Sequence, residues 1–284
     1  MPDLLARILD ESLRFEFLCG GVSPIRQPHS TSWRVLPGLM CSQIQRGRFR
    51  ILLEGGAEIP VPTGSLMLLA AGTRHCVDLM LPTGRVCWVH VNFYILHNLD
   101  LFTLVELPPV VPPKTGQAVG DLIEAWIGVS NKPGLTPLEL GAHKHEFGFS
   151  LLRLLSPLAR VQPDALERMA LREKLGRVLD HMHRHFDRPL RRDELAKLAC
   201  LSSAQFHRLF LLATGSAPMD YLRQLRLRQA QQRLLTTALP VAEIAAQVGY
   251  EDVFVFSKFF KRSCGLPPSE YRSSLHEIRM AVER

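Results

Sequence analysis

Hydrophobic residues in the first third of the chain come in short runs that Gly and Pro interrupt. The runs cover residues 48–53, 65–70 and 86–94, and turn signals separate them at 55–56, 72 and 82–84. Strands at this spacing, with turns between them, are typical of a β-sandwich or a β-barrel. We therefore expect a β-barrel domain over residues 1–112.

A helical pattern follows the Pro- and Gly-rich break at residues 108–116. The second helix predicted there begins at Thr136, because Thr136 and Glu139 fit a capping box and Pro137 fits the first helical position. Its apolar residues recur at steps of three and four positions, at Phe147, Leu151, Leu154, Leu155 and Leu158. This stripe packs either on its own barrel or on a second subunit. We expect residues 113–166 to be a helical dimerisation and linker segment.

The remaining residues, 167–284, have an almost continuous helical pattern that contains a helix-turn-helix unit at 189–215. A short helix with Leu195 and Ala196 precedes a tight turn, and Ser202 is a good N-cap for the next helix. Small Ala196 lets the two helices cross closely. The second helix has the short, polar outer face that a DNA major groove can accommodate.

A second copy of this pattern lies at residues 240–265. It repeats the apolar-Ala pair, the turn and the spaced phenylalanines, here Ile244, Ala245, Gly249, Phe256 and Phe260. Between the copies, residues 218–235 predict a helix of about 27 Å with a basic side. With its flanking units, such a helix can hold two recognition helices about one DNA turn, ~34 Å, apart.

The net positive charge of the chain lies in its helical, C-terminal part. Residues 1–165 have 14 basic and 14 acidic residues, whereas residues 166–284 have 20 and 13, so the whole net charge of +7 lies in the second group. A confined positive excess indicates a polyanionic partner. Together with the two helix-turn-helix patterns, this excess predicts that the C-terminal domain binds double-stranded DNA.

The cysteines and the hydropathy pattern indicate a cellular compartment. None of the six cysteines forms a C-x-x-C pair, so we expect buried free thiols in a reducing environment. No apolar run reaches the about 18 residues that a membrane span needs, and the first residues lack the apolar core of a secretory signal. We expect a cytoplasmic protein with no membrane partner.

The C-terminal pattern resembles the AraC/XylS family of bacterial transcription regulators. The resemblance covers about residues 167–272 and rests on DELAKLACLSSAQFHRLF, the G-x-x-P-x-x-Y-L-R run ending at Ala230, LPVAEIAAQVGYED, FSKFFK and GLPPSEYR. It implies two helix-turn-helix units, promoter binding and regulation through the N-terminal domain, with RNA polymerase as a further partner. By family position, the DNA-contacting residues are Ser203, Ala204, Gln205, His207 and Arg208 in the first unit, and Val253, Phe254, Ser257 and Lys258 in the second.

The second unit departs from the family, because Val253 and Phe254 stand where polar base-contacting residues are common. Neither can hydrogen-bond a base, whereas Arg208 of the first unit can bond both acceptors of a guanine. We expect the first unit to supply most of the specificity and Lys258 to contact a phosphate or a guanine. Since an exposed Phe is costly to hydrate, we expect Phe254 to pack against protein rather than on a thymine methyl group.

Residues 64–75, GSLMLLAAGTRH, resemble the second half of a cupin signature that presents His75 at a barrel mouth. Strand alternation in 86–93 puts Trp88 and His90 on one face, which can line the barrel. Sugar-binding regulators of this family have residues similar to Arg46, His75 and Trp88. We expect Arg46, His75, Trp88 and His90 to form a weak site for a small-molecule effector such as a sugar or a related metabolite.

The alternative function is a cupin-type metal-dependent enzyme. Such sites need two or three His and a carboxylate around one metal ion, and the only upstream candidate is His29, which has no His partner nearby. We therefore expect no catalytic residues, no metal, no cofactor and no enzymatic activity. A second alternative is a regulator whose N-terminal domain binds a protein or no ligand. The sequence predicts an α+β protein: a cupin-like β-barrel, the helical segment, and an all-α double helix-turn-helix domain. We expect the protein to be a homodimer.

Overall fold

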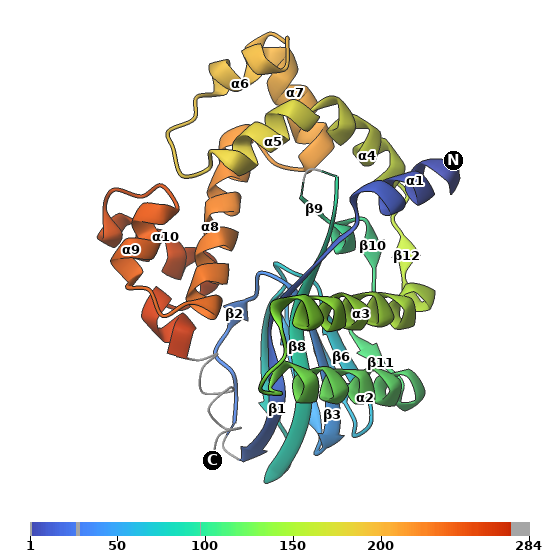
Figure 1. Ribbon diagram of the computed structural model, residues 1–284. Coiled ribbons are helices and arrows are strands. Elements are labelled where there is room, and N and C mark those ends of the chain that lie inside the picture. The colour runs from blue at the N-terminus through green and yellow to red at the C-terminus, as the bar shows by residue number, and fades with distance from the viewer. Residues whose placement is uncertain (1, 27–28, 97, 274–284) are drawn as a thin grey trace. The chain divides into compact units, whose positions relative to one another are not determined.

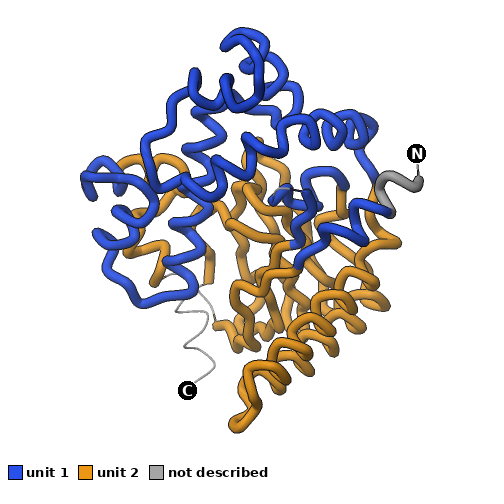
Figure 2. The backbone as a smooth tube through the Cα atoms, turned by 45° about the horizontal axis from the view of Figure 1, so that its top comes forward, with its two compact units in different colours: residues 1–14, 93–105, 161–257 blue, residues 15–92, 106–160, 258–284 orange. Residues whose placement is uncertain are grey.

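The computed structural model describes residues 2–26, 29–96 and 98–273. The chain divides into two compact units, which Figure 2 colours separately. Unit 1 comprises residues 1–14, 93–105 and 161–257, and unit 2 comprises residues 15–92, 106–160 and 258–284. Unit 2 contains most of the strands and unit 1 most of the helices, which confirms the predicted α+β class. The domain boundaries predicted at 112 and 166 stay a prediction.

Two antiparallel sheets form the N-terminal domain (Figure 1). The larger has the strand order β1-β8-β3-β6-β11 with β9 beside β8, and the smaller has the order β2-β7-β4-β5. The strands are β1 (Arg14–Arg26), β2 (Arg34–Val35), β3 (Leu39–Arg46), β4 (Phe49–Leu53), β5 (Glu58–Val61), β6 (Leu66–Leu69), β7 (Arg74–Leu79), β8 (Thr83–Ile95), β9 (Leu99–Asp100) and β11 (Val110–Val111). The three predicted apolar runs are thus the strands β4, β6 and β8.

Alternation along β8 separates an inner face of the large sheet from an outer face. Cys87 belongs to the outer face, since its Sγ lies 3.7 Å from the backbone oxygen of Gly120 in helix α2 (Pro113–Ser130). Gly120 has to be small, because a Cβ there would lie 2.9 Å from the side chain of Gln43 in β3. Trp88 and His90 therefore point to the opposite, inner face.

Helices α2 and α3 (Pro137–Leu155) lie beside each other across the large sheet (Figure 1). The predicted capping box of Thr136 and Glu139 is present. Within the break predicted at 108–116, Val110 and Val111 form the edge strand β11, which pairs with β6, and α2 begins at Pro113. Pro is well suited to the first turn of a helix, where its missing N–H costs no hydrogen bond.

The apolar stripe of α3 packs on its own domain. The ring of Phe147 lies 5.9 Å from that of Phe15 in β1 and stacks at 5.5 Å on Trp126 of α2. A Cβ at Gly148 would lie 2.3 Å from Phe15, so α3 approaches the sheet closely. Leu151 and Leu155 are fully buried as well. Of the two alternatives for this stripe, packing on its own barrel is the one that the structure has.

Most helices of the structure belong to unit 1, and one of them was not predicted from the sequence. They are α1 (Pro2–Ser12), α4 (Ala165–Lys174), α5 (Gly176–Arg184), α6 (Arg192–Leu198), α7 (Ser203–Thr214), α8 (Pro218–Thr236) and α9 (Val241–Gln247); α10 (Val253–Cys264) begins in unit 1 and ends in unit 2. Helix α1 was not predicted. The first part of the predicted, almost continuous helical pattern forms two helices, α4 and α5, which meet at Leu175.

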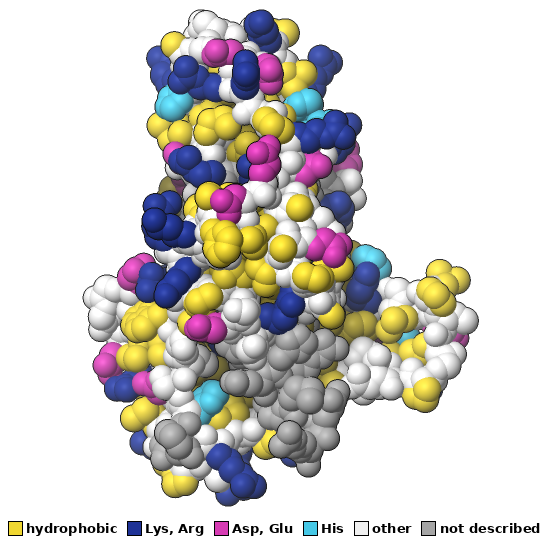
Figure 3. Space-filling model, turned by 90° about the vertical axis from the view of Figure 1, so that its left-hand side faces the viewer, with side chains coloured by type: hydrophobic (Ala, Val, Ile, Leu, Met, Phe, Trp, Pro, Cys, Tyr) yellow, Lys and Arg dark blue, Asp and Glu magenta, His cyan; other side chains and the backbone are white. Residues whose placement is uncertain are grey.

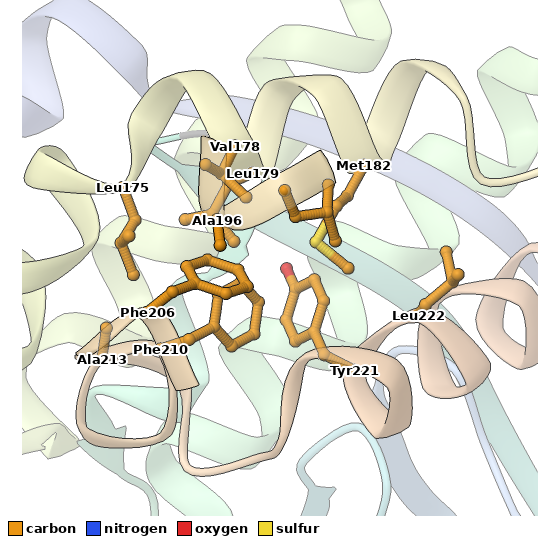
Figure 4. Packing of buried hydrophobic residues seen from close by; sticks show 11 residues of the cluster. Leu175, Val178, Leu179, Met182, Ala196, Phe206, Phe210, Ala213, Tyr221 and Leu222 are labelled. Carbon is orange, nitrogen blue, oxygen red and sulfur yellow. The ribbon is translucent and has the colours of Figure 1, made fainter. Parts of the chain in front are cut away.

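The first helix-turn-helix unit has a continuous apolar core (Figure 4). Phe206 and Phe210 of α7 lie edge to face at 5.4 Å, and Phe210 has the same relation to Tyr221 of α8. Leu195 and Ala196 of α6 are buried in the same cluster, as predicted. This core joins α5, α6 and α7 to the start of α8.

Arg226 of α8 joins the two helix-turn-helix units. Its Nε donates to the backbone oxygen of Phe186 at 2.7 Å and its Nη2 to that of Arg188 at 2.8 Å, both just after α5. Its Nη1 donates to the backbone oxygen of Gly249, in the turn of the second unit, at 3.1 Å. The guanidinium also lies 5.7 Å from the ring centroid of Tyr250. One side chain thus fixes α8 against both units.

The first prediction is that Arg226→Met destabilises the helix-turn-helix part of the chain by about 2–4 kcal/mol, because three carbonyl groups lose a charged donor. Thermal and urea unfolding followed by circular dichroism measure this change. Arg223→Met, on the same helix but at an exposed position paired with Asp220, is the matched control and should change stability by less than about 0.5 kcal/mol. Equal effects of both substitutions would show that Arg226 has no special role.

Candidate DNA-binding surface and barrel interior

The first recognition helix, α7, begins with a capping box. The hydroxyl of Ser202 accepts from the N–H of Gln205 at 3.3 Å, and the Gln205 side chain accepts from the N–H of Ser202 at 3.2 Å. Ser203 donates to Asp193 of α6 at 2.5 Å. Two of the predicted DNA-contacting side chains, Ser203 and Gln205, therefore stabilise the start of the helix in the DNA-free protein.

The outer face of α7 presents few groups that are free to contact bases. Ala204 and Arg208 are exposed and His207 is half-buried. All three side chains lie on α7, and none of them takes part in the hydrogen bonds described above. Further along the same helix, Leu211 and Leu212 are 43% and 59% exposed, which adds apolar surface at the end of α7.

The turn of the second helix-turn-helix unit requires a glycine. Gly249 has a φ of +82°, in the left-handed region, and a Cβ there would lie 2.7 Å from the backbone oxygen of Asp187. The first unit has a non-glycine residue, Cys200, at a φ of +55° in its turn. The close approach to Asp187 therefore makes Gly249 the less replaceable of the two turn residues.

The second recognition helix, α10, presents apolar side chains at its N-terminal end. Asp252 caps this helix, because its Oδ1 accepts from the N–H of Phe254 at 2.6 Å and of Val255 at 3.2 Å. Phe254 is 82% exposed and Val255 is 58% exposed. The prediction that Phe254 packs against protein is wrong. Phe256 and Phe260 occupy the buried face of α10, and Phe254 lies two positions before Phe256, away from that face.

The other two predicted positions of α10, Ser257 and Lys258, are half-buried and exposed respectively, and Val253 is half-buried. Figure 3 faces the side on which α9 and α10 lie in Figure 1, and it shows hydrophobic side chains interspersed with Lys and Arg. A surface of this mixed kind can contact both the phosphates and the apolar edges of bases.

The basic side predicted for α8 is largely occupied by contacts within the protein. Besides Arg226, Arg233 donates to Gln247 at 3.0 Å and lies 5.7 Å from the ring of Phe186. Arg228 lies 5.8 Å from the ring centroid of Tyr221. These arginines hold the helix-turn-helix units on α8, whereas Arg208 of α7 and Lys258 of α10 are exposed.

Comparisons with known proteins identify this arrangement. The family described as "Helix-turn-helix domain" matches residues 195–274. The Regulatory protein SoxS of Escherichia coli (strain K12) is 38% identical over 91 residues, which are 32% of this chain and 85% of that protein. The chain belongs to the AraC/XylS family. It is thus an AraC-type helix-turn-helix transcription regulator, as predicted.

Two further comparisons extend over most of this AraC-type chain. The RCS-specific HTH-type transcriptional activator RclR of Escherichia coli (strain K12) is 26% identical over 248 residues, which are 81% of this chain and 86% of that protein. The crystal structure of an apo ToxT variant from Vibrio cholerae strain SCE256 covers 93% of this chain and 98% of its own, with a TM-score of 0.53 and 14% identity, and so shows a common fold. Among the described residues, no helix of this AraC-type regulator is long and apolar enough to cross a membrane.

The barrel interior brings together three of the four predicted effector residues. His75, Trp88 and His90 are all buried, and the rings of Trp88 and His90 lie 5.1 Å apart. The indole Nε1 of Trp88 donates to the hydroxyl of Ser23 at 2.9 Å. Arg46 is exposed at the end of β3, so the structure does not group it with the other three.

A further inward residue, Arg34 of β2, was not predicted. It stands opposite His75 of β7 in the small sheet and is only 5% exposed. A strand of two residues has no alternation from which an inward side chain could be recognised, so the sequence held no signal for this position. Arg34 thus brings to the barrel interior the positive charge that the prediction had assigned to Arg46.

Both inner histidines are neutral at pH 7. Burial, followed by the charge of Arg34, lowers the pKa of His75 to about 4. Burial, Arg34 and His75 lower the pKa of His90 to about 3, and His90 Nδ1 lies 3.6 Å from the Cys19 thiol. Within the described part of the chain, no three His, Cys, Asp or Glu side chains are grouped so that they could hold a metal ion.

The second prediction is that the barrel loses stability as the pH falls from about 6.5 toward 4. Since the folded-state pKa of each histidine lies below its unfolded value, the unfolded chain binds more protons in this window. The free energy of unfolding should fall by about 1.4 kcal/mol per pH unit for each histidine. Urea unfolding at several pH values, followed by Trp fluorescence, measures the slope.

The double variant His75→Gln with His90→Gln should have a flatter pH profile, because Gln has no proton to gain in this range. His145→Gln, an exposed histidine of α3, is the control and should keep the wild-type slope. If the double variant keeps that slope too, other groups cause the acid sensitivity.

Proposed function

We propose that this AraC-type regulator binds promoter DNA with α7 and α10 in two successive major grooves, and that a small molecule in the barrel controls it. The observation that supports this most directly is the attachment of both units to α8 through Arg226. Helix α8 has 19 residues and is about 28 Å long, so the units at its two ends suit a groove spacing of ~34 Å. The protein works in the cytoplasm, with RNA polymerase as a further partner.

The two recognition helices divide the work. Arg208 is exposed on α7 and can bond both acceptors of a guanine, worth about 1–3 kcal/mol of discrimination. Ala204 permits close approach, and His207 lies on the same face. On α10, exposed Phe254 can contact a thymine methyl group, and exposed Lys258 can contact a phosphate. The first unit thus supplies most of the specificity, and the second supplies affinity with a preference for A·T pairs.

The effector is held by the inner face of the barrel, where His75, Trp88 and His90 lie. A sugar or a related metabolite is consistent with the relatives named after the raffinose operon of Pediococcus pentosaceus and the lactose operon of Staphylococcus xylosus. The relatives with curated names are transcription regulators, which speaks against the alternative of a cupin enzyme.

The regulator also forms a homodimer, through the exposed side of α3 rather than through the buried stripe. Phe149 is 44% exposed, and Leu138 at the start of the same helix is 84% exposed. Both side chains lie off the face that packs on the sheet. A dimer reading two repeated half-sites would bury this apolar surface.

The third prediction tests the division of work with selections of random DNA duplexes by wild type, Arg208→Ala and Lys258→Ala. Arg208→Ala should lose the base preference at one position, because the bidentate contact to guanine is gone. Lys258→Ala should weaken all sequences about equally and reduce the salt slope by about 1, because one phosphate contact is gone. The assignment is reversed if Lys258→Ala erases a base preference while Arg208→Ala leaves the selected motif intact.

The fourth prediction is that Phe254→Ser weakens binding to the selected site without changing the salt slope, since an apolar contact releases no counterions. The expected loss is about three- to thirtyfold, and titration by fluorescence anisotropy measures it. Leu81→Ser, at a 44% exposed apolar position between β7 and β8, is a control for the loss of exposed apolar surface and should leave the affinity, the salt slope and the recovered motif unchanged.

The fifth prediction concerns the dimer. The Phe149→Glu variant should be a monomer, because the charge cannot be buried at an apolar interface. Light scattering measures its mass. Leu211→Glu, at a 43% exposed apolar position on α7, should leave the mass unchanged. A monomeric wild type, or a Phe149→Glu protein that stays dimeric, excludes this face as the interface.

A further inference from the structure

Arg34 is a buried cation for which the described residues supply no carboxylate. It is 5% exposed, its Nε has no hydrogen-bond partner, and it takes part in none of the ion pairs found among those residues. Its nearest acidic neighbours are the phenol of Tyr271 and the thiols of Cys76 and Cys19. Burial lowers the pKa of Arg34, but a guanidinium keeps its proton in proteins.

A second arginine of the same sheet shows the usual arrangement. Arg50, on the outer face of β4, donates to Glu58 at 2.9 Å and to Asp78 at 2.7 Å, although it is one-third exposed. The more deeply buried Arg34 therefore has the poorer set of partners. Because an unpaired buried charge is costly, a negative group from outside the chain would stabilise this site.

The groups beside Arg34 determine what else such a ligand must contain. His75 is neutral, and its Nδ1 lies 2.9 Å from the backbone oxygen of Thr73, so the Nδ1–H donates and Nε2 is left as an acceptor. That Nε2 is buried without a partner. Asn92 donates through its Nδ2 to Glu16 at 3.1 Å, and its Oδ1 is a buried acceptor without a partner.

These groups lie on facing walls of the barrel. Arg34 and His75 are paired on the small sheet. Asn92 follows Trp88 and His90 on the inner face of β8, and Met40 of β3, opposite His90, adds an apolar side chain to that wall. The polar side chains of both walls are at most 5% exposed, so the two walls enclose one buried interior. The charge of Arg34 on one wall also contributes to the lowered pKa of His90 on the other.

We propose that the barrel binds a small hydroxy acid, whose carboxylate pairs with Arg34 and whose hydroxyl groups donate to His75 and Asn92. The proposal rests on the proposed effector response and names its chemical class. One negative charge matches the single guanidinium. Hydroxyl donors match the two unpartnered acceptors without adding a second positive charge, as an ammonium group would. A sugar acid belongs to this class, whereas a neutral sugar would leave Arg34 without an anion.

Glycolate, the smallest hydroxy acid, is the probe for the full-length protein. Saturation-transfer NMR and titration should show that glycolate binds about three- to tenfold more tightly than acetate, which lacks the hydroxyl, and at least about tenfold more tightly than neutral glycolamide. Sodium chloride keeps the ionic strength constant. Equal binding of glycolate and glycolamide, or displacement of glycolate by equimolar chloride, overturns the proposal, as does the absence of binding by glycolate.

Arg34→Met should abolish glycolate binding and, without ligand, should melt at the same temperature as wild type or higher, because an unpaired buried charge has been removed. Arg74→Met, the half-exposed neighbour of His75, is the control and should bind glycolate normally. A large fall in melting temperature for Arg34→Met would mean that the fold itself satisfies Arg34, and would overturn the proposal. Arg34→Lys keeps the charge and should retain weaker binding.

The effector response is measured separately, as the change in affinity for the selected DNA site on adding glycolate. Binding to the barrel without any change in DNA affinity would leave the hydroxy-acid site in place and refute the effector response. A DNA response that persists in Arg34→Met would support an effector response and refute this site.

Discussion

The contact of Arg226 with three backbone carbonyl groups determines the geometry on which DNA recognition depends. Two of these carbonyls follow α5 and one lies in the turn before α10, so a single guanidinium bridges the two helix-turn-helix units. Backbone carbonyls are fixed in position by their own chain. Their common donor therefore converts the long helix α8 from a linker into a rigid spacer. Neither unit needs a large core of its own, because each shares α8 with the other.

The barrel interior differs from the helix-turn-helix core. Polar groups occupy positions in it where apolar side chains would cost less free energy to bury. Buried histidines, an asparagine and an arginine line its inner face, while the outer face of the large sheet is sealed by α2 and α3. Burying these polar groups costs free energy. A ligand that binds only the folded state would offset this cost, because it would stabilise that state.

The sequence predicted the parts of this molecule that depend on local patterns. The strands β4, β6 and β8, the capping box of α3 and the Leu-Ala and Phe-Phe positions of the helix-turn-helix units all follow from spacing and end signals. The edge strand β11 was missed, because its pairing with β6 joins residues more than 40 positions apart and Pro-rich sequence obscured it. Arg34 was missed for a similar reason: only the facing sheet makes its position interior.

The exposed face of α10 was predicted wrongly from a sound rule. Hydration of an aromatic ring is unfavourable, and Phe254 was therefore assigned to the protein interior. The helix places Phe256 and Phe260 there instead, which leaves no room on the same face for Phe254. The rule about hydration holds, but it applies to the complex with DNA as well as to the free chain.

An aromatic side chain that is 82% exposed also affects the behaviour of the protein away from its operator. In solution, copies of the chain can associate through this exposed apolar side chain at high concentration. Any DNA that α10 binds through its phosphates would cover the same helix. Non-specific DNA would then also keep Phe254 out of contact with other proteins.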